Sequence, residues 1–224
     1  MKLQCADANY EDKYDVCDLV LHIAKFMMGD NILKDKITVC FKDYEKDEKG
    51  FTVYGSCADL QEMNCYAVHV NEPSLFENRM NSIREIRTDI GINSQIHINI
   101  NYDFFKTAEW SMIVRTIIHE LTHAMQMFCA RLVSIPYYWF EATELGMKRC
   151  RGFVTMWKTK EHGFHFITDE QVLSHQEYLD LPWEVAARRA EEKLLPLALR
   201  YLRHFDKWDE RITRDDIIAL EVTA

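Results

Sequence analysis

The sequence predicts an α+β fold for a single domain over residues 1–224. Short alternating segments within residues 1–105 predict a small mixed sheet beside an N-terminal helix. Residues 106–224 read as a central helix followed by a helical C-terminal half. The stretch from Thr107 to Val133 has no Gly or Pro, and an apolar face recurs over residues 186–205. With 48% hydrophobic residues the chain can bury one sizeable core.

The N-terminal part contains one helix and several strands in its pattern. Apolar side chains at helical spacing predict a helix over residues 11–28, which Gly29 can end. Alternation of apolar and polar residues predicts strands over 36–42, 51–57 and 66–70. The first two strands are separated by a charged turn, so we expect them to form a hairpin.

A fourth strand and the longer helices follow. Isoleucines alternate with polar residues from Gln95 to Asn101, which predicts a strand. Thr107 is a suitable N-cap for the next helix, which we expect to end before Pro136. The last helix is predicted over residues 186–205, with Pro196 bending it or dividing it in two.

Composition excludes several classes of partner. Acidic residues outnumber basic ones by 36 to 27, and the net charge of −9 opposes binding to phosphate backbones, so no nucleic acid is expected. No apolar run approaches the roughly 18 residues of a membrane span. The seven cysteines form no C-x-x-C pair and the first residues lack a secretory signal, which favours reduced thiols and a cytoplasmic location.

Residues 119–123 carry the most informative motif, His-Glu-Leu-Thr-His. On a helix, His119 and His123 share one face and can both reach one zinc ion. Glu120 lies about 100° round the helix from His119. There it can accept a proton from a water activated by the metal without being a ligand. Two histidines and an acid on one stripe would be costly to bury without a metal.

A catalytic zinc ion normally has three protein ligands and an open position, so a third ligand must come from elsewhere. The candidates are Cys129, Glu141 or Glu144 on a second helix, Glu184, and the histidines His162, His165 and His175. Cys129 follows His123 by six residues and points away from the pair if the helix continues. Glu184 is a candidate because Pro182 suits the first turn of a helix, and Glu184 then lies in the same turn.

The motifs resemble those of a known family. Thr-x-x-His-Glu-Leu-Thr-His-Ala, residues 116–124, is similar to the active-site helix of zincin metallopeptidases. H-E-L-x-H-x-x-Q followed by Y-x-x-x-P-x-E-x-x-A resembles small gluzincin-like members, many encoded by bacteriophages and bacteria. The matching residues here are His119, Glu120, Leu121, His123, Gln126, Tyr178, Pro182, Glu184 and Ala187.

The resemblance implies a zincin-like fold and zinc-dependent hydrolysis of peptide bonds. One Zn²⁺ would be held by His119, His123 and Glu184, with Glu120 as the general base. Tyr178 would donate a hydrogen bond to the developing oxyanion. Larger gluzincins carry an Asp four residues after the ligand Glu to orient the first His. Arg188 occupies that position here, so the role falls to another acid (Glu141, Glu144 or Glu177) or to a backbone carbonyl.

The resemblance also indicates how a partner would bind. In zincins the strand before the motif helix is commonly a sheet edge that pairs with an extended substrate. We therefore expect residues 95–102 to be such an edge for a protein or peptide. The alternative function is a non-catalytic zincin-fold structural or interaction protein, for instance a viral particle component. A phage-encoded protein would lie in the host cytoplasm or the virion. A metal-free interaction module with an accidental motif is a further alternative.

Overall fold

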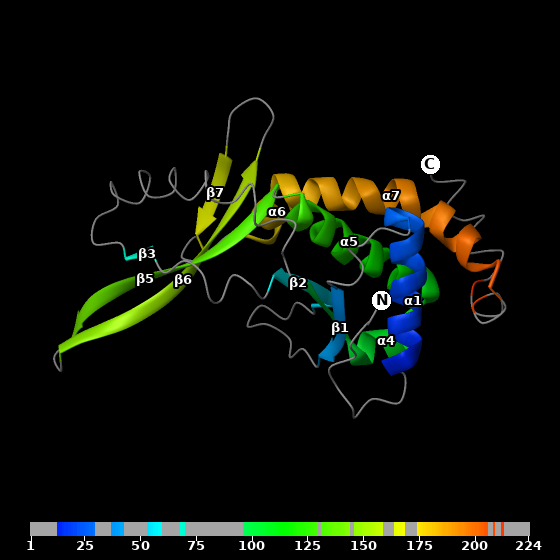
Figure 1. Ribbon diagram of the computed structural model, residues 1–224, viewed down its shortest axis with the longest axis horizontal. Coiled ribbons are helices and arrows are strands. Elements are labelled where there is room, and N and C mark those ends of the chain that lie inside the picture. The colour runs from blue at the N-terminus through cyan, green and yellow to red at the C-terminus, as the bar shows by residue number, and fades with distance from the viewer. Residues whose placement is uncertain are drawn as a thin grey trace. The chain divides into compact units, whose positions relative to one another are not determined.

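The computed structural model describes residues 13–29, 37–42, 53–59, 68–69, 96–129, 131–143, 146–158, 164–168 and 174–205, with Trp208 and Ile212. Its elements are both helices and strands, which confirms the α+β class (Figure 1). They belong to two units. The first comprises residues 1–58, 96–124 and 184–224, and the second comprises 59–95 and 125–183. The assignment of residues 1–224 to one domain stays a prediction.

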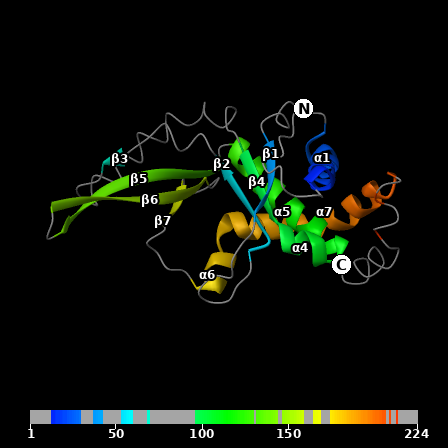
Figure 2. The same ribbon diagram turned by 90° about the horizontal axis from the view of Figure 1, so that it is seen from below.

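The first unit contains a three-stranded sheet in the order β1-β4-β2 (Figure 2). Its strands are β1 (Ile37–Lys42), β4 (Ile96–Asn101) and β2 (Gly55–Asp59). β1 and β4 pair in parallel along their whole length. Asn101 N donates to Tyr54 O at 2.9 Å, and Asn99 Nδ2 donates to Ser56 Oγ at 3.1 Å. Tyr54 thus lies opposite Asn101, and Ser56 lies opposite Asn99. Residue numbers rise along one strand as they fall along the other, as in an antiparallel pair.

This strand order corrects two expectations. The hairpin predicted from residues 36–42 and 51–57 is wrong, because β4 lies between β1 and β2. The sheet edge expected at residues 95–102 is corrected for the same reason: β4 is the central strand, and β1 and β2 are the edges of this sheet among the described strands. The alternating pattern of β4 indicates which face is buried, but it carries no information about the neighbours of a strand.

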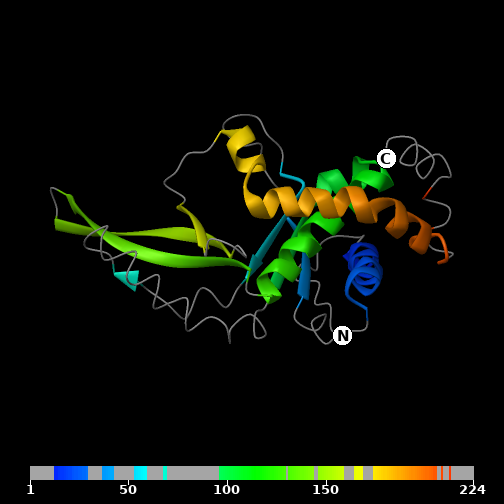
Figure 3. The same cartoon turned by 90° about the horizontal axis from the view of Figure 1, so that it is seen from above.

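One face of this sheet forms the core with helix α5 (Trp110–Phe128). Ile96, Ile98 and Ile100 are fully buried. The apolar stripe of α5 is also buried, at Ile113, Val114, Ile117, Ile118 and Leu121. Three views of the first unit agree that α5 lies between the sheet and α7 (Figures 1 to 3). Helix α1 (Lys13–Met28) lies against β1 and ends at Gly29, whose φ is 65°.

A short helix that the sequence pattern did not predict precedes the motif helix, which is α5 in the structure. Helix α4 (Tyr102–Thr107) precedes α5, and its N-cap is Asn101, whose side chain accepts a hydrogen bond from Phe104 N at 3.1 Å. Thr107 is therefore the last residue of α4 and not an N-cap. Its hydroxyl donates to Asp103 O at 2.7 Å within α4. A local bond to the preceding turn thus replaced the cap that the sequence favoured.

The last described helix, α7, spans Pro182–Leu202. It begins at Pro182, in agreement with the preference of proline for the first turn. It continues through Pro196 as one helix, so the predicted division at this residue is wrong. None of the helices in the described ranges combines the length and the apolar composition that crossing a lipid bilayer requires.

The second unit contains a sheet in which the sequence pattern predicted one strand, over residues 66–70. Strands β5 (Leu132–Thr143) and β6 (Gly146–Lys158) form a long antiparallel hairpin. The sheet order is β3-β5-β6-β7, where β3 is Val68–His69 and β7 is Phe164–Thr168. Residues 132–143 include many β-branched and aromatic residues, which favour strands. The helix expected around Glu141 is therefore a strand, and Glu144 lies outside the described residues.

Candidate metal centre

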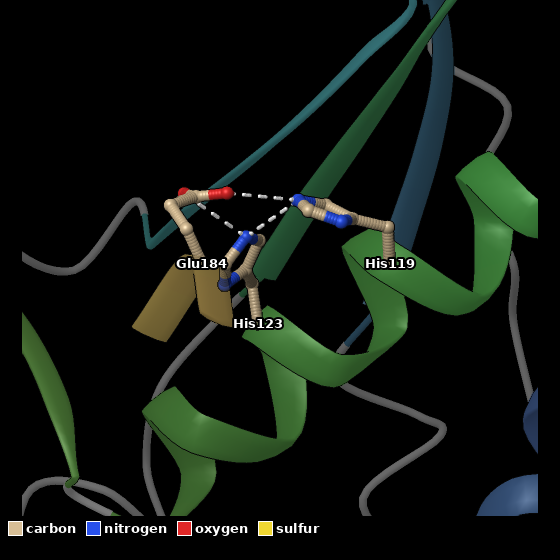
Figure 4. A group of neighbouring side chains, drawn as sticks. All are labelled: His119, His123 and Glu184. Carbon is tan, nitrogen blue, oxygen red and sulfur yellow. Dashed lines mark hydrogen bonds and ion pairs between the residues drawn. The ribbon is translucent and has the colours of Figure 1, made fainter. Parts of the chain in front are cut away.

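Two histidines on α5 form one side of the site. His119 and His123 lie one helical turn apart, and their Nε2 atoms are 2.9 Å from each other. Their rings project from the same side of α5 toward α7 (Figure 4). His123 is buried and His119 is partly exposed. The i, i+4 spacing of the motif thus produces a pair of imidazole nitrogens that point to one place.

Glu184 completes the group from the first turn of α7. One carboxylate oxygen is 3.2 Å from His119 Nε2 and the other is 3.4 Å from His123 Nε2. Glu184 is buried, with 3% of its surface exposed. Within the described residues, these three side chains form a group that can hold a metal ion, with ligand atoms within 4.8 Å of one another.

The donor set fits a zinc-like ion. Two imidazole nitrogens and one carboxylate oxygen are zinc ligands, and three of them leave a position open. Tetrahedral ligands about 2.0–2.1 Å from zinc are themselves about 3.3 Å apart. The two separations between Glu184 and the histidines are close to this value, and the separation of the two histidines is shorter.

Glu191 orients the first histidine and was missed in the sequence. His119 Nδ1 donates to Glu191 Oε1 at 2.5 Å. A carboxylate only accepts, so Nδ1 carries a proton, and Nε2 is the ring nitrogen that would bind a metal. Glu191 follows Glu184 by seven residues, close to two turns of α7. That spacing was the available signal, because residues seven apart share a helix face.

The other acids considered for this role lie elsewhere. Glu177 accepts from Ser174 N at 2.7 Å, in a capping box at the start of α6 (His175–Leu179). Glu141 belongs to β5. His119 Nδ1 is hydrogen-bonded to Glu191, so the expectation that Glu141, Glu144 or Glu177 orients His119 is corrected in favour of Glu191.

Burial, hydrogen bonds and neighbouring charges shift the pKa values of three groups in the site. Burial raises the pKa of Glu120 to about 7, although the charges of His119 and His123 act against it. Burial lowers the pKa of His119, but its hydrogen bonds with Glu184 and Glu191 outweigh burial and raise it to about 10. Burial also opposes ionisation of Glu184, yet hydrogen bonds from the histidines hold its pKa well below the usual range.

The remaining sequence candidates fall in the second unit or outside the described residues. Tyr178 is on α6 and 47% exposed, and its role as an oxyanion donor stays a prediction. Cys129 follows α5 and is exposed, and His165 belongs to β7. His162 lies outside the described residues. Gln126, part of the resembled motif, donates from Nε2 to Trp183 O at 3.2 Å and so anchors the backbone just before Glu184.

Comparisons with protein-family models, curated proteins and solved structures found no match to this chain. Function is therefore inferred from the chemistry of the site. The decisive features are the convergence of His119, His123 and Glu184, the carboxylate of Glu191 behind His119, and the buried Glu120 beside the pair.

The contact from Glu191 predicts a loss of metal affinity when its charge is removed. We expect Glu191→Gln to weaken zinc binding about 10–100-fold, the usual effect of removing a partner that orients a ligand. Competition with a chromophoric chelator measures the dissociation constant. Glu192→Gln is the matched control, because Glu192 is the next residue of α7 and is exposed. Equal affinities for the two variants would show that Glu191 does not support the metal site.

Proposed function

We propose that this chain is a zinc-dependent metallopeptidase of the zincin type, with a gluzincin-like ligand set. The observation that carries the proposal is the group of His119, His123 and Glu184, with Glu120 next to the first histidine on a buried stretch of α5. Zinc would be held by the three ligands. The resemblance of residues 116–124 to a zincin active-site helix supports the same conclusion.

The residues suit hydrolysis of a peptide bond. Zinc in such a site acts as a Lewis acid toward the scissile carbonyl and the attacking water. The carboxylate of Glu120 takes a proton from that water as its oxygen adds to the carbonyl carbon. It then gives the proton to the amine that leaves when the C–N bond breaks. A pKa raised to about 7 by burial suits a group that must both accept and donate near neutral pH.

The edge strand β2, whose first residue lies beside Glu120 of α5, supports a peptide as the substrate. β2 is antiparallel to β4, is at the edge of the described sheet, and begins at Gly55, which lies beside Glu120. We propose that an extended peptide adds to β2, and not to residues 95–102 as the sequence suggested. Tyr178 remains the proposed oxyanion donor.

The cell compartment belongs to the same proposal. The seven cysteines are odd in number and form no C-x-x-C pair. This pattern suits reduced thiols in a reducing compartment, which supports a cytoplasmic enzyme. The net charge of −9 supports a protein or peptide partner over nucleic acid.

Metal removal tests the function. Protein purified without chelator is expected to contain one zinc ion per chain and to cleave members of a pool of fluorescence-quenched peptides. Treatment with 1,10-phenanthroline should abolish cleavage, and added Zn²⁺ should restore it, because the ligands would remain in place. Zinc without any cleavage would favour the alternative, a structural or interaction protein with this fold. Protein that binds no zinc even after addition would overturn both.

A further inference from the structure

Gly55 lies against the catalytic end of Glu120. A methyl group built at Gly55 would be 3.0 Å from Glu120 Oε1 and 3.1 Å from Glu120 Cγ. It would also be 3.0 Å from Thr116 Cγ2, one turn earlier on α5. The backbone of Gly55 is not in the left-handed region, which among the described glycines occurs at Gly29. Space, and not backbone conformation, is therefore the reason that a side chain is disfavoured at this position.

The backbone at Gly55 is held in place from β4. On one side of Gly55, Tyr54 O accepts from Asn101 N at 2.9 Å and Val53 O accepts from Asn101 Nδ2 at 3.0 Å. On the other side, Ser56 Oγ accepts from Asn99 Nδ2 at 3.1 Å. Three hydrogen bonds thus tie the residues around Gly55 to the central strand. The strand resists moving outward to make room for a side chain.

Glu120 has little freedom on its own side. It is buried, with 5% of its surface exposed, so it cannot turn out into solvent. Its neighbours on α5 are His119 and the fully buried Leu121. A group that pushes Glu120 from the Gly55 side would therefore displace it relative to the ligands.

We infer that Gly55 is a positioning residue whose bare backbone sets the place of the Glu120 carboxylate beside the metal ligands. This inference rests on the proposed function only in taking Glu120 as the general base. The three heavy atoms nearest to a methyl group at Gly55 belong to Glu120 and Thr116 and not to the proposed ligands, so the two roles separate. Substitution should move the base while His119, His123 and Glu184 still bind metal.

The first test uses Gly55→Ala. We expect turnover of a cleaved peptide from the quenched pool to fall about tenfold. A misplacement of a catalytic group by 1 Å can lower the rate about 10²-fold, and the contact with the methyl group requires Glu120 to shift by a few tenths of an ångström. KM should change less than turnover, because the added methyl group meets Glu120 and Thr116. The dissociation constant for Co²⁺, followed by its visible absorption, should stay within about threefold of the wild type. Unchanged turnover, or loss of Co²⁺ binding, would overturn the inference.

The second test needs no substrate. Gly→Ala ordinarily stabilises a site that accepts the methyl group, so a lower unfolding midpoint in Gly55→Ala reports the crowding. Glu120→Asp withdraws the carboxylate, and in that background Gly55→Ala should no longer lower the midpoint. Thr116→Ser removes only Cγ2 and is the matched control for crowding against the helix. Relief by Thr116→Ser alone would overturn the inference, because Gly55 would then serve packing only.

Failure of the proposed function and failure of the inference about Gly55 give different results in these tests. If the wild type cleaves no peptide in the pool, the proposed function fails. The coupling between positions 55 and 120 in the unfolding midpoint then still decides whether Gly55 sets the place of the carboxylate. If the wild type cleaves peptides but positions 55 and 120 show no coupling, the proposed function stands and the role of Gly55 is rejected.

Discussion

Replacing Glu120 with Gln is expected to lower peptide turnover by about 10²–10⁴-fold while zinc remains bound, which is the usual contribution of general acid–base catalysis. Gln has nearly the same shape as Glu but cannot take a proton. Glu120 is not one of the three side chains whose ligand atoms converge, so the metal group stays complete. Turnover and zinc content of the same preparation are the two measurements.

Controls separate a chemical effect from a structural one. Glu109→Gln changes an exposed acid just before α5 and should leave turnover unchanged. The unfolding midpoint of Glu120→Gln should not fall below that of the wild type, since a neutral side chain is easier to bury than a carboxylate. Full turnover by Glu120→Gln would exclude Glu120 as the base, and loss of zinc would make it a ligand instead.

Replacing Glu184 with Ala should have the largest effect on the metal. We expect zinc affinity to fall on the order of 10²–10³-fold, because roughly 10–16 kcal/mol of zinc binding by four ligands is shared among them. Glu184 contributes the carboxylate that lies 3.2 Å and 3.4 Å from the two Nε2 atoms. Metal content by mass spectrometry, after purification without chelator, is the measurement, and peptide turnover should fall with the zinc.

Two further variants are the controls for Glu184→Ala. Glu192→Ala changes an exposed acid on the same helix and should retain stoichiometric zinc. Glu141→Ala removes the alternative ligand that the sequence left open, which belongs to β5. Zinc retained in Glu184→Ala but lost in Glu141→Ala would move the third ligand to that strand and reject Glu184.

Features that depend on neighbours along the chain could be predicted from sequence. His119 and His123 are four residues apart, and any α-helix brings such residues onto one face. The alternation in residues 95–101 correctly indicated the buried isoleucine face of β4. Pro182 correctly indicated where α7 begins, which in turn put Glu184 in the first turn. Each prediction needed only local periodicity or a backbone preference.

Features that depend on segments distant in sequence appeared only in the tertiary structure. Glu191 is 72 residues from His119, and its place behind the imidazole depends on how α7 packs on α5. Local bonding also added a helix that was not predicted, since Asn101 caps the short α4 before the motif helix. The long strand β5 followed strand-forming residues that had been assigned to a helix.

The sequence pattern could not predict which strands are neighbours in the sheet, for the same reason. β4 is central and β2 is antiparallel at its side, so the sheet edge and the approach of Gly55 to Glu120 follow from pairing and not from residue type. Periodicity tells which face of a helix or strand is buried. Which other segment covers that face depends on the packing of the whole unit, and that packing brings Gly55, Glu120, His119 and Glu191 together.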